Sequence, residues 1–440
     1  MARPAIMPDT AEPSAAELIA ARPHLSMHAM DGLLLEGIPL QAIADALGTP
    51  TWVYGGGTAH SRYVRLATAL KGLPAHIHYA VKANDHLAVL RIFARAGAGA
   101  DVVSEGEMLR AAAAGIAPDR IVFSGVGKTA RDLRAALGHG IAQVNVESPA
   151  ELEMLSGIAT GMGLAARVVL RINPDVDAGT HAKITTGRAD NKFGVPLNEA
   201  AALYAHAAML PGIVPMGIAL HIGSQILSLA PYHAAYARAA QLVRDLRAAG
   251  HEVSRVDCGG GLGIGYGDEA GASPEAFAGA LRAAFGGLDV ALIVEPGRWL
   301  VGPAGLLLAS VVLVKGHGRF VVLDAGMNDL VRPSMYDAWH GIVPLSAVDI
   351  LAPPAPVDIV GPVCETGDTF ARNRALAPLR AGARVAILDA GAYGAVMSST
   401  YNARPLAPIA MVGGGRWATI RERQSHAAMW AGETIPDFLA

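Results

Sequence analysis

The residues that could do chemistry in this sequence begin with a lysine in an apolar setting. Lys82 ends the segment 76-HIHYAVK-82, in which Tyr79, Ala80 and Val81 are typical of a buried strand. An amine that is partly withdrawn from water has a lowered pKa and is nucleophilic toward an aldehyde. Lys82 could therefore form a Schiff base. The alternative interpretation is a lysine that merely extends its ammonium from a strand end into solvent.

Three further features could bind a flat, phosphorylated partner for that amine. The run 259-GGGLG-263 has few side chains, so its backbone N–H groups can approach a phosphate closely. Glu295 could keep a pyridine nitrogen protonated, which makes the ring an electron sink, and His221 could stack on the ring face. Taken singly, a tight turn, a surface carboxylate and a hydrogen-bonded histidine explain these residues equally well. Together with Lys82 they indicate a pyridoxal phosphate site.

The elements that must position these residues alternate regularly between residues 60 and 299. Helical patterns alternate with eight short, continuously apolar runs, which is the character of buried parallel strands. Eight such units predict a closed (β/α)8 barrel, and an open doubly wound sheet is the alternative fold. The expected strands are residues 76–82, 100–104, 120–125, 142–147, 166–173, 216–223, 254–261 and 289–297.

Polar side chains gather at the carboxyl ends of these expected strands. Barrels of this kind carry their active sites at that end, so convergence on one rim indicates function rather than a mere scaffold. Besides Lys82, His221 and Glu295, the polar residues at strand ends are Ser104, Glu105, Ser124, Asn145, Glu147, Arg171, Asn173 and Ser224.

Three regions lie outside the expected barrel. Residues 1–32 lack periodicity and are expected to form a loose arm, whereas residues 33–59 contain strands that we expect to join a second domain. Residues 300–440 are expected to form that domain, mainly β with a C-terminal helix, because apolar runs such as 307–316 and 383–391 are separated by Gly- and Pro-rich turns. The predicted fold is α/β, a barrel plus a mainly β C-terminal domain.

Composition excludes several classes of protein. The net charge is −3 without a long basic run, which argues against a nucleic-acid partner. Two cysteines, Cys258 and Cys364, cannot build a disulfide framework or a metal cluster, and we expect no metal site. The longest apolar run, residues 304–314, is far below the ~20 residues of a membrane span. Without a signal-peptide pattern, a reducing cytoplasmic location is expected.

Seven motifs then give the sequence a family resemblance. They occur in order between about residues 33 and 412 and resemble the fold-type III decarboxylases that use pyridoxal phosphate, in particular the diaminopimelate decarboxylases. The motifs are HYAVKAN, GADVVSEGE, LHIGSQ, CGGGLG, EPGR, CETGD and DAGAYG. The resemblance implies decarboxylation of meso-2,6-diaminopimelate to L-lysine and carbon dioxide, the last step of lysine biosynthesis.

The resemblance also implies roles for individual residues around the cofactor. Lys82 would hold pyridoxal 5'-phosphate as an imine, His221 would stack on its ring, and Glu295 would pair with the ring nitrogen. Cys364, supplied by the second subunit of a homodimer with shared active sites, would protonate the carbanion. The phosphate region would be held by Ser224, Gly260, Gly261, Gly297, Arg298 and Tyr393.

The distal end of the substrate should decide the specificity. Diaminopimelate carries a second carboxylate and ammonium there, and arginine binds a carboxylate in a bidentate fork. Arg332 could bind that carboxylate with help from Tyr336, one helical turn on, and Glu365 could bind the ammonium. Arg298 and Tyr393 would also lie near the substrate. An exposed ion pair is the alternative role for Arg332.

Other functions remain open at this stage. A related enzyme could decarboxylate ornithine, lysine or carboxynorspermidine instead. A catalytically silent regulatory homologue should have lost Lys82 or Cys364, and both are present. A racemase of the same fold would need an acid–base tyrosine in the second domain, whereas the segment 364-CETGD-368 favours decarboxylation.

Overall fold

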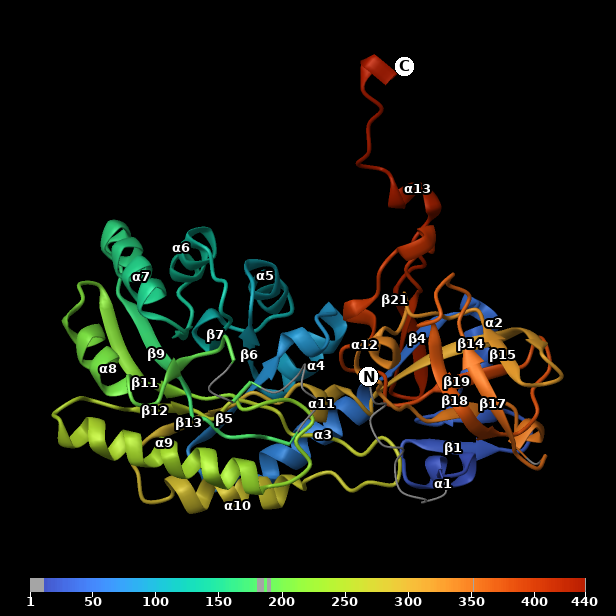
Figure 1. Cartoon of the computed structure of the whole chain (residues 1–440), viewed down its shortest axis with the longest axis horizontal. Helices are drawn as coiled ribbons and strands as arrows, with labels where there is room; N and C mark the ends of the chain where they lie inside the picture. Colours follow the sequence, from blue (N-terminus) through green and yellow to red (C-terminus); the bar gives the residue numbers. More distant parts are fainter. Residues whose placement is uncertain (1–11, 180–185, 188–190, 351, 440) are drawn as a thin grey trace, which may run out of the picture.

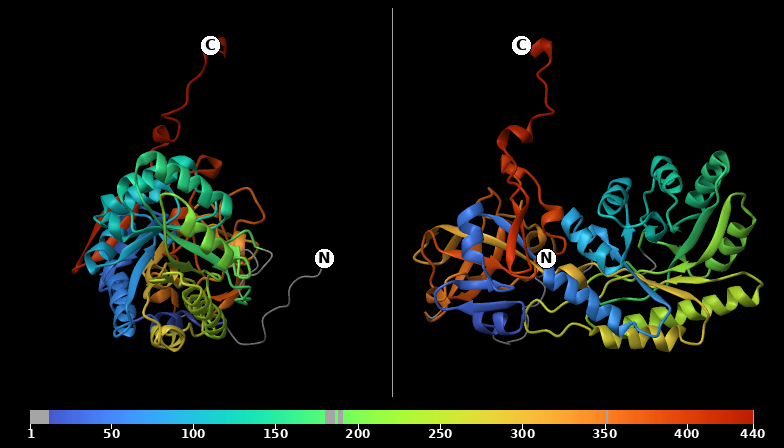
Figure 2. Two further views of the ribbon diagram at one scale, coloured as in Figure 1. Left: turned by 90° about the vertical axis from the view of Figure 1, so that its left-hand side faces the viewer. Right: turned by 180° about the vertical axis from the view of Figure 1, so that it is seen from behind.

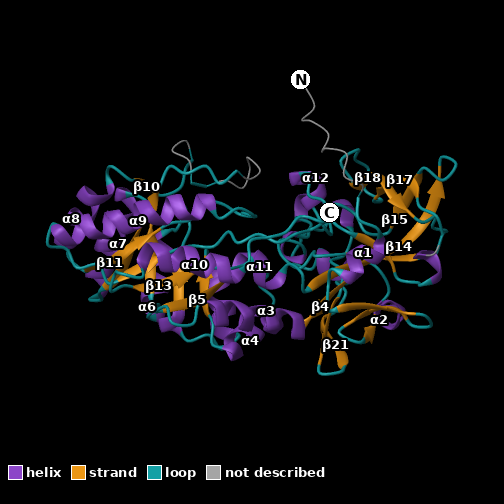
Figure 3. Cartoon of the chain, turned by 90° about the horizontal axis from the view of Figure 1, so that it is seen from below, coloured by secondary structure: helices purple, strands orange, loops and turns teal. Residues whose placement is uncertain are grey.

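The computed structural model of the chain describes residues 12–179, 186–187, 191–350 and 352–439. Figure 1 shows two regions side by side, a helix-wrapped barrel and a domain built mainly of strands. Seen from below, helices surround the barrel region and strands dominate much of the opposite end (Figure 3). Residues 1–11, the first part of the expected arm, lie outside the described residues.

Eight parallel strands close into the barrel. The strand order is β5-β6-β7-β8-β9-β11-β12-β13, and the pairing of β13 with β5 completes the ring. Closure confirms the predicted barrel and rules out the open doubly wound sheet. The strands are β5 (Ala75–Ala80), β6 (Gly99–Val102), β7 (Ile121–Phe123), β8 (Gln143–Val146), β9 (Ala166–Asn173), β11 (Ile213–Ala219), β12 (Arg255–Asp257) and β13 (Ala291–Val294), with short β10 (Val195–Pro196) beside β9.

Local sequence explains where several barrel helices begin. Ser104 and Ser148 cap their helices by accepting a backbone N–H, and Thr129 forms a reciprocal capping box with Asp132. These side chains satisfy N–H groups that have no partner inside the helix. The helices are α3 (Gly56–Ala69), α4 (Leu87–Ala96), α5 (Glu105–Ala113), α6 (Ala130–His139), α7 (Pro149–Met162), α8 (Ala200–Met209), α9 (Ala230–Ala248), α10 (Pro274–Phe285) and α11 (Arg298–Val301).

A second sheet of nine strands forms the β domain. Its strand β4 comes from the segment before the barrel and lies between β14 and β20, antiparallel to the first and parallel to the second. The chain therefore begins and ends in this domain and inserts the barrel between. The strands are β4 (Thr51–Gly55), β14 (Gly305–Lys315), β15 (Phe320–Leu323), β16 (Ile342–Pro344), β17 (Ala355–Val360), β18 (Thr369–Leu376), β19 (Arg384–Ile387), β20 (Ile409–Gly413) and β21 (Arg416–Arg421).

The prediction of a loose arm is wrong for the described residues 12–32. They fold into α1 (Ala15–Ala20) and β1 (Leu25–His28), and β1 pairs with β2 (Gly32–Leu35), which in turn pairs with β3 (Ile38–Pro39). Leu18 and Leu25 are buried in a separate apolar cluster that also contains residues of α2 (Leu40–Leu47) and the second sheet. Their apolar partners lie far along the chain, so local periodicity gave no sign of this packing.

An ion pair fixes this N-terminal segment to the β domain. Arg22 is buried and its Nη2 lies 2.5 Å from Asp389 Oδ2, while the same guanidinium donates to the carbonyls of Leu18 and Tyr266. Burial raises the pKa of Asp389, and the charge of Arg22 opposes that rise. The segment is thus part of the folded structure.

The C-terminal end packs little against the rest of the chain. Its helix α13 (His426–Met429) has four residues, and the chain beyond it runs away from both regions in all of the side views (Figures 1 and 2). Trp430 and Phe438 expose 52% and 85% of their surface, so this end buries little apolar area within one chain.

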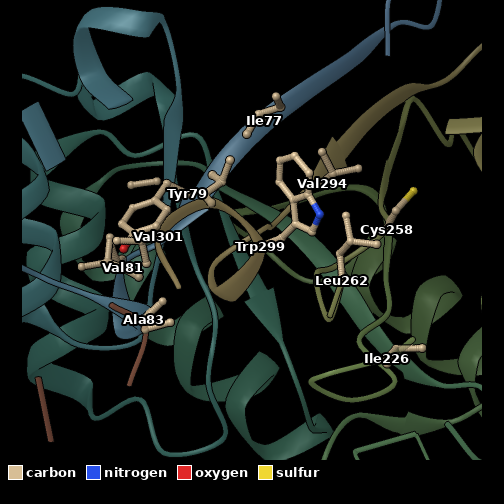
Figure 4. Close-up of a cluster of buried hydrophobic side chains, with 14 of the residues drawn as sticks. Ile77, Tyr79, Val81, Ala83, Ile226, Cys258, Leu262, Val294, Trp299 and Val301 are labelled. Carbon is tan, nitrogen blue, oxygen red and sulfur yellow. The ribbon is translucent and has the colours of Figure 1, made fainter. Parts of the chain in front are cut away.

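The apolar core reaches up to the base of the lysine-bearing turn. Figure 4 shows Tyr79 and Val81 on one side of this cluster, and Val294 and Trp299 from the β13–α11 connection on the other. Tyr79 is fully buried and its ring lies 4.4 Å from that of Phe93. Close packing here fixes the ends of β5 and β13 relative to each other. Within the described part of the chain, no helix has both the length and the apolar character needed to cross a membrane.

Replacing Arg22 with alanine should destabilise the protein far more than removing an exposed arginine. The change leaves the Asp389 carboxylate buried without its cation, which costs about 3–5 kcal/mol. Arg65→Ala is the matched control, because its pair with Glu275 is more than half exposed and such pairs are worth about 0–1 kcal/mol. Chemical denaturation of both variants measures the free energy of unfolding. Equal losses would show that the N-terminal segment contributes no buried ion pair to stability.

Candidate active site

Lys82 sits in a short 3-10 turn (Val81–Ala83) that ends β5, and its amine is ion-paired. Nζ lies 2.7 Å from Asp101 Oδ2, on neighbouring β6, and the Asp101 side chain is fully buried. Desolvation alone would lower the pKa of Lys82, but the charges of Asp101 and Glu295 outweigh it, so the pKa is raised. The predicted lowered pKa is therefore wrong. The amine is held as an ammonium.

Asp101 is a site residue that the sequence analysis missed. It stands in the run 100-ADVVS-104, whose apolar pattern predicts a buried strand and gives no role to the acid. The available signal was a single carboxylate inside a strand whose four residues are all buried. A buried charge of this kind needs a partner, and Lys82 on the adjacent strand is that partner.

Two more carboxyl groups lie near the lysine. Burial raises the pKa of Glu295 strongly, and repulsion by Asp101 and Asp257 adds to this rise while Lys82 opposes it. Asp257 accepts a hydrogen bond of 2.9 Å from Asn145 Nδ2. Glu295 Oε1 is buried without a hydrogen-bond partner among the described residues. That oxygen is available to a polar atom of a bound molecule.

His221 and the glycine turn are locked together beside these acids. His221 Nδ1 accepts a hydrogen bond of 3.2 Å from the backbone N–H of Gly260. Desolvation, Lys82 and Arg171 lower the pKa of His221 well below its usual value, so the ring is neutral. A Cβ on Gly260 would lie 2.1 Å from the carbonyl oxygen of Glu295, so only glycine permits this approach.

These residues surround one small cavity of about 210 Å³, which we call the lysine cavity. The structure thus brings together the predicted lysine, histidine and glutamate at the carboxyl ends of three different strands. Polar and charged residues that line it are Lys82, Ser124, Asn145, Arg171, Thr186, His221, Asp257 and Glu295.

Residues predicted to bind phosphate lie next to this cavity. Arg298 Nη2 donates to Ser224 Oγ at 3.1 Å, and its guanidinium lies 4.8 Å above the ring centre of Tyr393. The backbone N–H of Tyr393 donates to the carbonyl of Ala83 at 2.8 Å. The loop that carries Tyr393 therefore extends from the β domain to the turn that carries Lys82. A Cβ on Gly297 would lie 2.9 Å from Ala83 Cβ, so the two motifs also meet there.

Arg332 is buried, in contrast to the alternative of an exposed ion pair. It begins α12 (Arg332–Tyr336), exposes 5% of its surface, and its guanidinium lies 4.8 Å from the ring centre of Tyr266. The hydroxyl of Tyr266 accepts from Arg298 Nη1 at 2.7 Å. Tyr266, which the sequence analysis missed, therefore connects two buried arginines. The sequence feature that could have identified Tyr266 is its position as an aromatic residue just after the glycine run 259–263.

Cys364 and Glu365 lie apart from the lysine cavity. Cys364 is exposed with a free thiol, and Glu365 accepts a hydrogen bond from the hydroxyl of Tyr401. Asp368 shapes this loop by accepting from the backbone N–H groups of Val363 and Met327 at 2.6 and 2.7 Å. Among the residues that line the cavity in the described part of the chain, neither Cys364 nor Glu365 occurs.

Comparison with known proteins agrees with this geometry. The family model described as "Pyridoxal-dependent decarboxylase, pyridoxal binding domain" matches residues 57–302. Diaminopimelate decarboxylase from Zymomonas mobilis is 50% identical over 400 residues, which cover 89% of this chain and 94% of the relative. The enzyme of the same name from Pseudomonas aeruginosa is 45% identical, covering 92% of this chain and 97% of the relative.

A solved structure shows the same architecture. Diaminopimelate decarboxylase from Helicobacter pylori, complexed with L-lysine, superposes with a TM-score of 0.86 at 39% identity, covering 89% of this chain and 98% of that one. Sequence identity and coverage of this extent reach well beyond the barrel into the β domain. The chain therefore belongs to the family of pyridoxal-dependent decarboxylases.

Proposed function

We propose that this protein uses pyridoxal 5'-phosphate to decarboxylate meso-2,6-diaminopimelate to L-lysine and carbon dioxide. The observation that carries the substrate assignment is Arg332. It is a buried cation next to a second buried arginine, Arg298, and has no carboxylate partner among the described residues. Burying a charge without a counter-charge is costly, so a substrate carboxylate is the natural partner. The relatives named above support the same substrate.

The residues around the lysine cavity fit the cofactor. Lys82 would hold its aldehyde, the partnerless Oε1 of Glu295 suits its ring nitrogen, and the neutral ring of His221 suits its flat face. When bound, pyridoxal phosphate takes up the electron pair that is released as the carboxylate leaves. Residues that would hold the phosphate region are Ser224, Gly260, Gly261, Gly297, Arg298 and Tyr393.

Asp101 controls the proton on the lysine. At 2.7 Å, Asp101 Oδ2 accepts a hydrogen bond from Lys82 Nζ and raises the pKa of the lysine, so the amine would have to give up a proton before it bonds to an aldehyde carbon. Desolvation and the neighbouring acids raise the pKa of Glu295, so this residue would hold a proton that it could share with the ring nitrogen of the cofactor. The barrel strands thus fix which atoms carry protons before the substrate enters.

The distal end of the substrate would be bound by the second domain. Arg332 would pair with the distal carboxylate, with Tyr336 in the same helix beside it, while Arg298 and Tyr393 would lie at the junction with the cofactor. Glu365 would bind the distal ammonium. As a substrate, ornithine or lysine has only the carboxylate that is lost, so an enzyme for either would leave the buried Arg332 guanidinium without a counter-charge.

A homodimer with shared active sites would complete this arrangement. Cys364 and Glu365 are exposed and outside the lysine cavity of their own chain, so a second copy could receive them at its cavity. There the Cys364 thiol would deliver a proton to the carbanion. Because both cysteines are free, a reducing compartment such as the cytoplasm suits the protein.

The direct test is product formation by the purified chain. Supplied with pyridoxal phosphate, it should convert meso-diaminopimelate to equal amounts of lysine and carbon dioxide. Lys82→Ala should abolish both turnover and the yellow absorbance of bound cofactor, because no amine remains to hold the aldehyde. Lys71→Ala, an exposed lysine on the barrel surface, should change neither. A yellow Lys82→Ala protein with normal turnover would refute the assignment of the lysine.

Arg332→Ala should raise the KM for meso-diaminopimelate by roughly tenfold to a hundredfold, since hydrogen bonds to charged groups contribute about 1.5–3 kcal/mol. Cofactor absorbance should stay unchanged because the lysine cavity is intact. The control is Arg244→Ala, an exposed arginine on α9 whose partner is Gln241. Unaltered kinetics in Arg332→Ala would remove the argument for diaminopimelate over ornithine or lysine.

Mixing two inactive variants tests the shared site. In a hybrid dimer of Lys82→Ala and Cys364→Ala subunits, one of the two cavities would combine an intact Lys82 with an intact Cys364. Random exchange should therefore restore about a quarter of the wild-type activity, as expected for a symmetric dimer. Mixing Lys82→Ala with Glu295→Gln, both in the cavity of a single chain, should restore none. Failure of the first pair to recover activity after subunit exchange would place Cys364 outside the neighbouring cavity.

A further inference from the structure

A buried histidine stands directly behind Arg332. His340 follows α12, exposes 1% of its surface, and its Nε2 lies 2.7 Å from Arg332 Nη1. On the other side of the ring, Nδ1 lies 2.7 Å from the carbonyl oxygen of Leu388. His340 contacts neither Lys82 nor the other residues of the lysine cavity, so the chemistry described above leaves its role open.

The two contacts determine the protonation of the ring. A carbonyl oxygen can only accept a hydrogen bond, so Nδ1 carries the proton. In the neutral ring Nε2 then presents a lone pair and accepts from Arg332. Burial and the charge of Arg332 lower the pKa of His340 well below its usual value, which keeps the ring neutral. A protonated ring would point an N–H at the guanidinium.

The histidine is itself held from behind. Arg374 Nη1 donates to the backbone carbonyl of His340 at 2.9 Å, and its guanidinium lies 4.4 Å from the ring centre of Trp339. Glu12 forms an ion pair of 3.0 Å with Arg374 and accepts a hydrogen bond of 3.1 Å from Trp339 Nε1. The edge of the imidazole also packs against Tyr266, with ring centres 5.1 Å apart. The ring therefore has a fixed position from which to hold Arg332.

We propose that His340 is a positioning residue that aims the Arg332 guanidinium at the distal carboxylate of the substrate. One N–H of Arg332 is occupied by Nε2, and the remaining N–H groups keep one orientation for a bidentate pair. Ordering a long side chain before binding removes an entropic cost that binding would otherwise meet. His340 then favours substrates with a carboxylate at that end over diamino acids without one. This inference rests on the proposed function.

Two substitutions separate the contacts of the ring. In His340→Asn the amide nitrogen can still donate to Leu388, but nothing reaches Arg332. In His340→Gln the longer side chain can place an oxygen where Nε2 was and accept from Arg332. His251→Asn is the control, because His251 packs against Tyr204 in the loop before β12, away from the carboxyl ends of the strands.

The holoenzyme of each variant is assayed for KM and kcat with meso-diaminopimelate, for inhibition by 1,5-diaminopentane, a diamine without any carboxylate, and for cofactor absorbance. His340→Asn should raise KM about tenfold, the effect of losing one hydrogen bond to a charged group. The kcat, the diaminopentane inhibition constant and the absorbance should stay within about twofold, as should every value for His251→Asn. His340→Gln should recover most of the wild-type KM.

Each other outcome contradicts the inference. An unchanged KM in His340→Asn would show that Arg332 needs no support. Parallel weakening of diaminopentane inhibition and cofactor absorbance would show a purely structural role. If His340→Asn does not fold, a His340→Gln protein whose KM rises as far as that of Arg332→Ala would refute the acceptor role. Absence of lysine formation by the wild-type enzyme would instead refute the proposed function, without bearing on the Arg332–His340 contact.

Discussion

The rest of the site depends on one ion pair, between the partly exposed amine of Lys82 and the fully buried carboxylate of Asp101. The amine at the end of β5 is surrounded by three carboxyl groups, Asp101, Asp257 and Glu295, and only Asp101 touches it. One positive charge cannot balance three negative ones in a desolvated space, so burial keeps a proton on Glu295. The charge of Lys82 opposes that protonation, whereas Asp101 and Glu295 both raise the pKa of Lys82. A ring nitrogen that needs a proton fits that arrangement.

The β domain contacts the barrel at the turn that carries Lys82. The carbonyl of Ala83, next to Lys82, accepts from the backbone of Tyr393, and Asn84 donates to the carbonyl of Gly391. Asp389, in the same loop, is held by Arg22 from the N-terminal segment. Three segments far apart in the sequence therefore converge on the turn that carries the reactive amine. Glycine at 391 allows the approach, because a Cβ there would lie 2.1 Å from the carbonyl oxygen of Val301.

The strands and the residues at their ends could be predicted from local patterns in the sequence. Contacts between residues that lie far apart in the chain could not. Apolar runs located all eight barrel strands, and strand ends located Lys82, His221 and Glu295, because parallel strands of a barrel place those ends on one rim. The direction of the Lys82 pKa shift was predicted wrongly, since its sign depends on the 2.7 Å contact with Asp101. The folded N-terminal segment was missed for the same reason. Its partners, such as Asp389, lie hundreds of residues away.

The barrel and the β domain contribute different residues to the candidate active site. The barrel contributes Lys82, His221 and Glu295, which would hold the proposed cofactor, whereas Arg332 and His340 belong to the β domain and would lie at the distal end of the proposed substrate. Arg298 joins the two sets, because it touches Ser224 on the barrel side and Tyr266 beside Arg332. The segment 332–340 carries no group that touches Lys82, so its residues can change substrate preference without changing the charges around the amine. Specificity in this fold can therefore diverge while the barrel chemistry stays constant.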